Sequence, residues 1–388
     1  MNRIPALFSL IALVFLFSCV NNQSQKIVSE KIEEIRSQVA PDKRVAIWEL
    51  NFENGVLSGK TDQIEGFEQL IQELEEMDIS FENQVIKLPH ADLEGKTRAL
   101  VTISVANIRS QPKHSAELAT QALMGTPLTV LEKEDSWYRV QTPDDYISWV
   151  DAAGIKLMTE AELESWYRSA KVVFTDFSGF VWADESQTER ISDLVAGDIL
   201  NLTEETNTSY LVQLPDGRAG IIEKSKATPW EEWIASRETS PEKLIATAKE
   251  MMGAPYLWGG TSIKGIDCSG FTKTIFYLNG QIIPRDASQQ VNEGNEVDVD
   301  KNWNKLEVGD LLFFGQKATD DIKERVVHVG MWIGNNQFIH SRGRVRISSF
   351  DPESPLYDEY ELNRYLRTKR IINTPSENVL SVSTLIQN

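Results

Sequence analysis

Cys268 is the side chain of this sequence best suited to act as a nucleophile. It stands in the motif Asp-Cys-Ser-Gly-Phe at 267–271, and apolar residues at helical spacing follow it through Leu278. The pattern predicts a helix that begins at the cysteine, where unpaired backbone N–H groups and the helix dipole favour the thiolate over the thiol. The alternative is a small buried core residue, as free cysteines usually are, so the catalytic hypothesis needs partner residues.

Two of the four histidines lie on neighbouring predicted strands. His328 falls in the strand 326–334, His340 falls in the strand 337–341, and an Asn335-Asn336 turn joins them. A two-residue loop that pairs 334 with 337 puts the two imidazoles on opposite faces of the hairpin. An odd-length loop or a bulge puts them on one face, for example with 330 opposite 340. We predict such a bulge, with Asn335 or Asn336 in the left-handed conformation.

The elements before the cysteine segment change in type along the chain. Helical patterns and a hairpin turned at Asn54-Gly55 predict a small α+β unit, to which the sequence assigns no chemistry. Short strands separated by turns follow from about Thr97, resemble a bacterial SH3-like domain, and recur as a weaker second copy. Ser240 is expected to cap a helix from about Glu242 to Met251.

Residues from about 240 to 375 resemble the NlpC family of cell-wall cysteine peptidases. The motif at 267–271, the strand 306–314, His-Val-Gly at 328–330 and Phe-Ile-His-Ser at 338–341 carry the resemblance. It implies a papain-like α+β domain. Together with the SH3-like domain, it implies a γ-D-glutamyl-L-diamino acid endopeptidase that trims peptidoglycan stem peptides.

The expected fold is therefore multidomain: a small N-terminal α+β unit, SH3-like β-barrels, and a papain-like α+β peptidase domain. The expected boundaries are a signal peptide at 1–18, a tether and α+β unit at 19–95, an SH3-like domain at 96–157, a second copy and linker at 158–240, the peptidase at 241–375 and a tail at 376–388.

The resemblance also implies a role for each residue of the motifs. Cys268 would attack the γ-D-glutamyl carbonyl and form a thioester, with His328 as general base and then general acid. His340 would orient His328 through its second nitrogen. The Cys268 backbone N–H and the Tyr256 hydroxyl would form the oxyanion hole. The alternative for Tyr256 is a core aromatic residue with a solvated hydroxyl.

Substrate recognition follows from the same resemblance. The SH3-like domain would wall off the groove and bind the free amine of an N-terminal L-Ala, which requires anionic partners. The alternative for Glu117 and Asp286 is that each is an ordinary solvated acid. Arg285 is expected to support its loop through ion pairs. The expected binding residues are Glu117 and Tyr146 from the barrel and Trp258, Asp267, Ser269, Asp286 and Ser288 from the peptidase.

The N-terminus carries the features of an export signal. Arg3 precedes an apolar run from Ala6 to Phe17, which is shorter than the ~20 residues that span a bilayer. Leu-Phe-Ser-Cys at 16–19 resembles a lipoprotein lipobox, so Cys19 is expected to be acylated and 21–25 to form a polar tether. The expected location is the cell envelope, facing the periplasm at the outer membrane. A plain secretory signal is the alternative.

Composition excludes several classes of protein. Asp plus Glu exceed Lys plus Arg, 58 to 39, and the net charge of −19 argues against a nucleic-acid partner. Two cysteines exclude a disulfide scaffold, a cysteine-rich zinc site and an iron–sulfur protein, and we expect no cofactor or metal. The expected partners are muropeptides and, through Cys19, a bilayer, and the protein is expected to be a monomer. The rival functions are a non-catalytic cell-wall peptide-binding lipoprotein and an amidase or acyltransferase on the same core.

Overall fold

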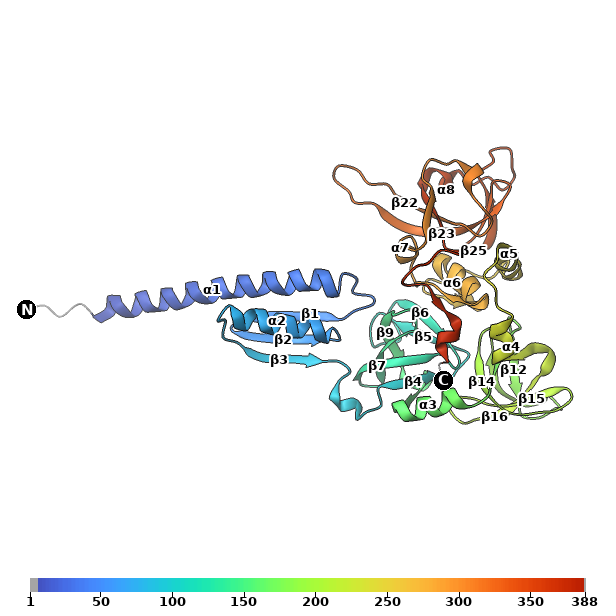
Figure 1. Cartoon of the computed structure of the whole chain (residues 1–388), viewed down its shortest axis with the longest axis horizontal. Coiled ribbons are helices and arrows are strands. Elements are labelled where there is room, and N and C mark those ends of the chain that lie inside the picture. Colours follow the sequence, from blue (N-terminus) through green and yellow to red (C-terminus); the bar gives the residue numbers. More distant parts are fainter. Residues whose placement is uncertain (1–5, 387–388) are drawn as a thin grey trace, which may run out of the picture. The chain divides into compact units, whose positions relative to one another are not determined.

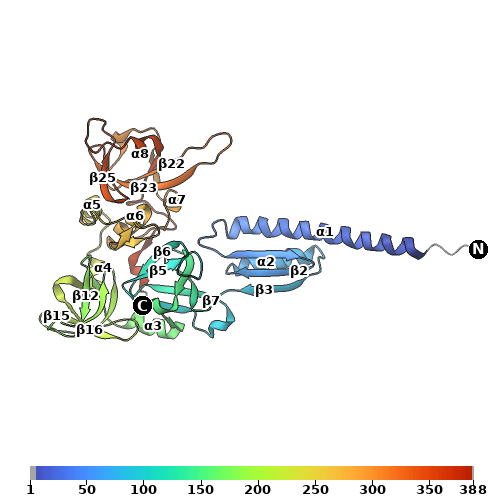
Figure 2. The same cartoon turned by 180° about the vertical axis from the view of Figure 1, so that it is seen from behind.

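The structure is a computed structural model that describes residues 6–386 of the chain, with side chains from residue 23 onward (Figures 1 and 2). Contacts divide it into two compact units, one ending at Glu94 and the other beginning at Gly95. The site residues predicted from the sequence, apart from Cys19, all lie in the second unit.

The first unit packs two helices against a three-stranded sheet around a core that includes Ile35, Phe52 and Leu70. Asn54 and Gly55 have φ angles of 54° and 82°, so the predicted hairpin turn is confirmed. The stretch 21–25, predicted as a tether, is helical and belongs to α1. The elements of the first unit are α1 (Ala6–Val39), β1 (Trp48–Glu53), β2 (Val56–Thr61), α2 (Ile64–Glu76), β3 (Glu82–Lys87) and η1 (Ala91–Leu93).

Cys19 lies in α1, but its side chain is outside the described part, as are residues 1–5 of the predicted signal peptide. Over the described residues, no helix combines the length and the apolar composition that crossing a bilayer requires.

The second unit begins with a seven-stranded barrel in the order β10-β4-β7-β8-β9-β5-β6. Fully buried residues from several of these strands, such as Leu100, Ile108, Val130 and Val140, form its interior. Its elements are β4 (Arg98–Val101), β5 (Val105–Arg109), β6 (Leu118–Leu123), β7 (Pro127–Glu134), β8 (Trp137–Gln141), β9 (Ile147–Asp151), η2 (Ala152–Gly154) and β10 (Ile155–Met158).

The next seven strands repeat the same arrangement. Their order is β13-β12-β16-β15-β14-β11-β17. Read from the β17 edge, it matches the order of the first barrel strand for strand, so the predicted second copy is confirmed. The two copies flank α3 (Glu160–Arg168), and α4 (Trp230–Ala235) follows the second. The strands are β11 (Lys171–Phe174), β12 (Gly179–Trp182), β13 (Arg190–Leu194), β14 (Ile199–Glu205), β15 (Ser209–Gln213), β16 (Ala219–Glu223) and β17 (Ala227–Pro229), with η3 (Lys224–Lys226) before β17.

The last domain packs helices against a six-stranded sheet in the order β21-β26-β22-β23-β24-β25 (orange to red in Figure 1). Its helices are α5 (Pro241–Glu250), α6 (Cys268–Leu278), α7 (Ala287–Gln290), η4 (Trp303–Lys305) and α8 (Glu359–Arg364). The sheet strands are β21 (Asn295–Asp298), β22 (Leu311–Gln316), β23 (Arg325–Gly334), β24 (Gln337–Arg342), β25 (Arg344–Ser349) and β26 (Tyr365–Arg370). Two short pairs stand apart, β18 (Thr261–Ser262) with β19 (Gly265–Ile266) and β20 (Gln281–Ile282) with β27 (Leu380–Ser381).

Two local predictions in this domain need correction. Ser240 occupies the N-cap position of α5, but its side chain makes no capping hydrogen bond, and Pro241 provides the first turn. The predicted tail is packed through residue 386: β27 pairs with β20, and in η5 (Val382–Leu385) the end residues are buried with the first barrel and α3. Apolar burial therefore holds the C-terminal segment in place.

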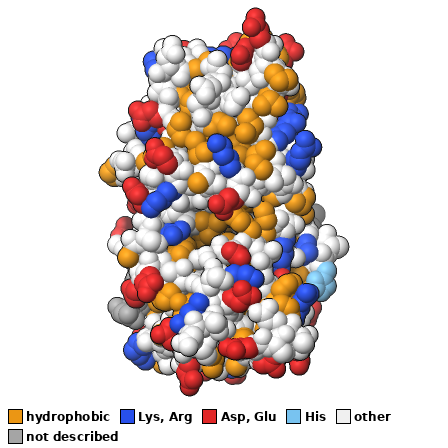
Figure 3. Space-filling model, turned by 90° about the vertical axis from the view of Figure 1, so that its right-hand side faces the viewer, with side chains coloured by type: hydrophobic (Ala, Val, Ile, Leu, Met, Phe, Trp, Pro, Cys, Tyr) orange, Lys and Arg blue, Asp and Glu red, His pale blue; other side chains and the backbone are white. Residues whose placement is uncertain are grey.

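The face of the molecule drawn in Figure 3 carries acidic and basic side chains of both signs, interspersed with apolar patches. On the described residues of that face, the basic side chains do not join into one continuous patch, in keeping with the net charge of −19.

Candidate active site

Cys268 begins helix α6, as the motif predicted. Asp267 caps the helix, and its Oδ1 accepts a hydrogen bond from the Gly270 N–H at 2.7 Å. The Cys268 sulfur accepts hydrogen bonds from the backbone N–H groups of Ser269 and of Val329, which lies on β23. The first turn of α6 is thus held against the strand that carries His328.

The hairpin of β23 and β24 brings both histidines to one face. Gly334 pairs with Gln337 across the turn, but the register shifts beyond Trp332, so that Met331 faces Ile339. Asn335 and Asn336 both have positive φ angles, of 52° and 55°. The predicted bulge and left-handed turn are therefore confirmed.

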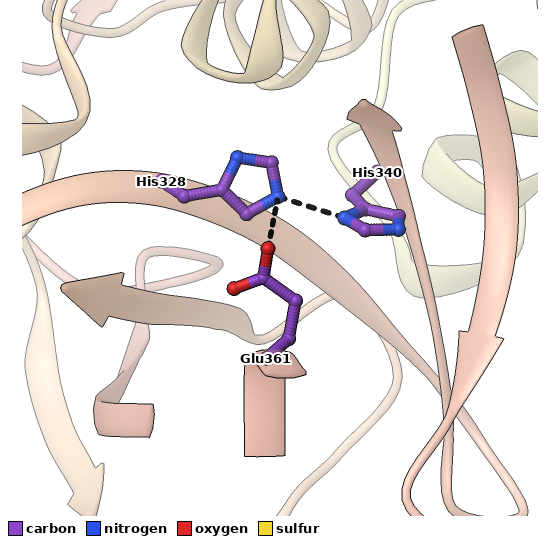
Figure 4. Close-up of side chains that lie close together, drawn as sticks. All are labelled: His328, His340 and Glu361. Carbon is purple, nitrogen blue, oxygen red and sulfur yellow. Dashed lines mark hydrogen bonds and ion pairs between the residues drawn. The ribbon is translucent and has the colours of Figure 1, made fainter. Parts of the chain in front are cut away.

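A chain of hydrogen bonds behind the nucleophile fixes the tautomers. The Ser348 hydroxyl donates its hydrogen to Asp358 Oδ2 at 3.0 Å. Ser348 Oγ must therefore accept the hydrogen bond from His340 Nε2 at 3.0 Å. His340 Nδ1 then accepts from His328 Nε2 at 2.7 Å (Figure 4). Arg346 Nε approaches His340 Nε2 at 3.4 Å and would require the opposite tautomer, but the shorter serine contact decides the assignment. His328 Nδ1 is left with a free lone pair, the form a general base needs.

Burial keeps the reacting groups neutral. It raises the pKa of the Cys268 thiol to about 12, with a smaller contribution from the Asp267 carboxylate. It also lowers the pKa of His340 to about 3 and holds the pKa of His328 well below its usual value, where His340 and nearby arginines add to the effect. The backbone N–H of Ser269 at the helix start does lower the pKa of the thiol, as predicted, but desolvation of a residue 7% exposed outweighs this effect and favours the thiol.

A cleft of about 670 Å³ opens above Cys268, and the first barrel forms one of its walls. His328 and His340 lie behind the cleft, buried at 7% and 0% exposure. Burial, with the neighbouring Cys268 and Asp267, raises the pKa of Tyr256. The predicted residues that line the cleft are Glu117, Tyr146, Tyr256, Trp258, Asp267, Cys268, Ser269, Asp286 and Ser288.

Two contacts join the barrel to the peptidase across this cleft. The Tyr146 hydroxyl donates to Asp286 Oδ2 at 3.3 Å, and Trp258 Nε1 donates to Glu117 Oε1 at 2.6 Å. Glu117 is exposed and Asp286 is half-buried, so both carboxylates remain within reach of a bound molecule.

Asp267 has a different position from the one expected for a substrate anchor. Its Oδ2 accepts from Arg285 Nη2 at 2.6 Å and from the Gly259 N–H at 2.9 Å, while its Oδ1 accepts from Arg285 Nη1 as well as from the helix start. Because these donors occupy both oxygens, Asp267 positions the helix rather than binding an ammonium. Arg285 supports its loop, as expected, and its Nη1 also reaches Ser269 Oγ at 3.0 Å.

Sequence reasoning missed residues on both sides of His328. Arg325, Val326 and Val327 precede it on β23 and line the cleft. Glu361 on α8 lies behind it, with Oε1 3.9 Å from His328 Nε2. The first set directly precedes His328 in the sequence, whereas Glu361 is 33 positions away along the chain and left no local signal.

One group of side chains in the described residues has the donor atoms of a metal site. Nitrogens of His328 and His340 and an oxygen of Glu361 lie within 4.8 Å of one another. Glu361 also pairs with Arg342 at 3.5 Å and with Arg364 at 3.3 Å. Two guanidinium groups beside the carboxylate oppose a divalent cation there, so the donor set fits a metal poorly.

A cysteine at a helix start, packed against a hairpin with two hydrogen-bonded histidines, defines a papain-like cysteine peptidase. Residues 253–382 match the NlpC/P60 family, and residues 108–155 match the bacterial dipeptidyl-peptidase SH3 domain. The chain belongs to the NlpC/P60 family.

Relatives with known names support this assignment. The chain is 34% identical to a γ-D-glutamyl-L-lysine dipeptidyl-peptidase of Bacillus cereus, over 64% of this chain and 76% of the relative. It is 31% identical to dipeptidyl-peptidase 6 of Lysinibacillus sphaericus, over 67% and 94%. A crystal structure of an NlpC/P60 family protein from Bacillus cereus matches with a TM-score of 0.61 at 27% identity, over 71% of this chain and 99% of that one.

Proposed function

We propose that the protein is a cysteine endopeptidase that hydrolyses the bond between γ-D-glutamate and the L-diamino acid in peptidoglycan stem peptides with a free N-terminal L-Ala. The observation that carries the proposal is the position of Cys268 at the base of a cleft whose other wall is the barrel. The names of the two relatives support this substrate class.

The reaction uses the neutral pair that the site holds at rest. As the Cys268 sulfur attacks the γ-carbonyl carbon, the thiol proton passes to His328 Nδ1 and the carbonyl oxygen becomes an oxyanion. The Cys268 backbone N–H and the Tyr256 hydroxyl donate to that oxyanion. When the C–N bond breaks, His328 returns the proton to the leaving amine, and a thioester remains. Water, deprotonated by His328, then releases the acid and the thiol.

The dipeptide end of the substrate points toward the barrel. Glu117 and Asp286 supply negative charge for the ammonium group of L-Ala, and the Tyr146 hydroxyl holds Asp286 in place. Trp258, 61% exposed, offers a ring face to the peptide. A substrate still linked to sugar carries an amide in place of the ammonium and cannot form the ion pair with these two carboxylates, so it is rejected.

The test compares wild type with Cys268→Ala on the tripeptide L-Ala-γ-D-Glu-L-lysine. The wild type releases L-Ala-D-Glu and the variant does not; equal rates would show a binding protein without turnover. N-acetylation of the terminal alanine lowers the wild-type rate. Undiminished cleavage of the acetylated peptide would instead indicate an enzyme that acts on intact wall.

We further propose that Cys19 is acylated and that the protein is a monomeric lipoprotein of the cell envelope. The apolar run and the lipobox-like tetrapeptide support the anchor. Mass spectrometry of the mature N-terminus tests it: a diacylated cysteine is expected at position 19, and an unmodified N-terminus elsewhere contradicts it. Size-exclusion chromatography with light scattering tests the monomer.

A further inference from the structure

We propose that Glu361 is a positioning residue for His328, whose buried carboxylate stabilises the imidazolium that forms when His328 takes the Cys268 proton. The inference rests on the proposed function for its chemistry. The known motifs of the sequence give no role to this glutamate, which lies on α8 and directs its carboxylate toward His328 (Figure 4).

The geometry singles out this carboxylate. Glu361 is fully buried, and its Oε1 lies 3.9 Å from His328 Nε2. Among the residues that the structure describes, no other carboxylate lies within ion-pair distance of His328. Asp358 Oδ1 accepts a hydrogen bond from the Glu361 backbone N–H at 3.1 Å and so fixes the first turn of α8. This cap holds the backbone of Glu361 in a single position.

The charges around His328 explain why the carboxylate matters. His340, from β24, is neutral, and Arg342 and Arg364 present positive charge, which lowers the pKa of His328. An imidazolium formed there would face guanidinium groups in a buried site. Asp358 and Glu361 are the acids that oppose them, and Asp358 is already bonded to Ser348. Asp358 raises the pKa of His328, and Glu361 is the carboxylate that lies within ion-pair distance of the new charge.

Pairing with arginine does not by itself account for a fully buried glutamate. Arg342 and Arg364 keep 40% and 23% of their side chains exposed, so water can solvate them without it. Burial raises the pKa of Glu361, an effect that Arg364 and Arg342 oppose. The arginines therefore favour the ionised form of Glu361, which is the form that stabilises an imidazolium on His328.

The first experiment is steady-state kinetics of Glu361→Gln on the tripeptide, across pH. We expect kcat at pH 7 to fall about 10- to 100-fold, because general acid–base catalysis contributes on the order of 10²–10⁴. KM stays unchanged, since Glu361 does not line the cleft. The acid limb of kcat/KM shifts to lower pH by about one unit, because loss of a neighbouring negative charge lowers the pKa of His328.

The matched control is Glu132→Gln. Glu132 is a buried glutamate that pairs with Arg139 at 3.1 Å in the first barrel, away from the histidines. Its variant keeps both the kcat and the acid limb of wild type. An acid limb that does not move in Glu361→Gln, or a kcat within twofold of wild type, would overturn the proposal.

A second readout needs no substrate and so separates this inference from the proposed function. In the Cys268→Ala background, NMR of labelled histidine follows the titration of His328 with and without Glu361→Gln. The midpoint is expected to fall by about one unit in the variant. Identical midpoints overturn the proposal. If Glu361→Gln does not fold, Glu361→Asp takes its place; it keeps the charge, withdraws it from His328, and shifts the midpoint in the same direction by a smaller amount.

Discussion

Trp258 Nε1 donates a 2.6 Å hydrogen bond to Glu117 Oε1 and thereby joins the peptidase to the barrel across the cleft. The two residues are 141 positions apart, and both remain exposed. The contact places a carboxylate at the barrel side of the cleft without burying it. Glu117 is therefore oriented and still able to accept a second donor.

The first prediction concerns this carboxylate. Glu117→Gln should lower kcat/KM for the free-amine tripeptide about 10- to 100-fold, because a hydrogen bond to a charged group contributes about 1.5–3 kcal/mol. The N-acetylated tripeptide serves as the control, since it carries no ammonium. Wild type and variant should cleave it equally slowly. An equal loss on both peptides would indicate that Glu117 acts only by holding Trp258.

The second prediction concerns the resting thiol. Because burial raises the pKa of Cys268 to about 12, its alkylation by iodoacetamide should quicken about tenfold per pH unit above neutrality. Cys19→Ser protein suits the measurement, since Cys268 is then its only cysteine. Modification of that one site should abolish activity. A rate that stays flat between pH 5 and 8 would instead reveal a preformed thiolate–imidazolium pair.

Local patterns were enough to predict the elements that carry the chemistry. The helix start at Cys268 follows from a capping residue and apolar spacing, and the hairpin bulge follows from the need to place His328 and His340 on one face. Both depend on residues close in sequence. The repeat of the barrel is visible for the same reason, because each copy has its own strand spacing.

What the sequence could not provide depends on packing between distant segments. The raised pKa of Cys268 comes from burial, which the motif does not encode. Asp267 lies beside the nucleophile, yet Arg285, 18 positions later, occupies its oxygens. Glu361 and the packed segment after residue 376 owe their places to tertiary contacts. Single-sequence patterns carry no information on such pairs.

The third prediction concerns the buried ion pair between the first barrel and α6. Lys273 and Asp144 pair with side-chain exposures of 15% and 2%. Asp144→Asn should destabilise the protein by about 3–5 kcal/mol in urea unfolding, because it leaves a buried ammonium without its anion. The exposed pair of Lys224 and Glu205 is the control, and Glu205→Gln should change stability by less than about 1 kcal/mol. Equal effects would show that the buried pair is solvated.

The fourth prediction concerns acid stability. The pKa of His340 is lowered to about 3 in the folded state, against about 6.5 when unfolded, so the unfolded state binds more protons between these values. Its contribution to stability is present above pH 6.5 and is lost as the pH falls toward 3, by up to about 1.4 kcal/mol per unit. Urea unfolding of His340→Asn at pH 7, 6 and 5 should show a correspondingly weaker decline than wild type. Parallel declines would contradict the lowered pKa.

The last prediction concerns Arg325, which lines the cleft at the start of β23. It is exposed and makes no ion pair with another described residue, whereas its neighbour Glu324 is held by Arg367 at 2.7 Å. Because His328, the donor to the leaving amine, follows three residues later on the same strand, we expect Arg325 to bind a carboxylate of the leaving diamino acid. Arg325→Gln should lower kcat/KM about tenfold for such substrates.

Three peptides distinguish the carboxylates that Arg325 could bind. If the group is the α-carboxylate of the leaving residue, the variant loses rate on L-Ala-γ-D-Glu-L-lysine but not on its C-terminal amide. If the group is the second carboxylate of a diaminopimelate, only the diaminopimelate tripeptide is affected. A uniform loss on all three peptides would contradict a leaving-side contact and assign Arg325 to the α-carboxylate of D-glutamate, which every one of them carries.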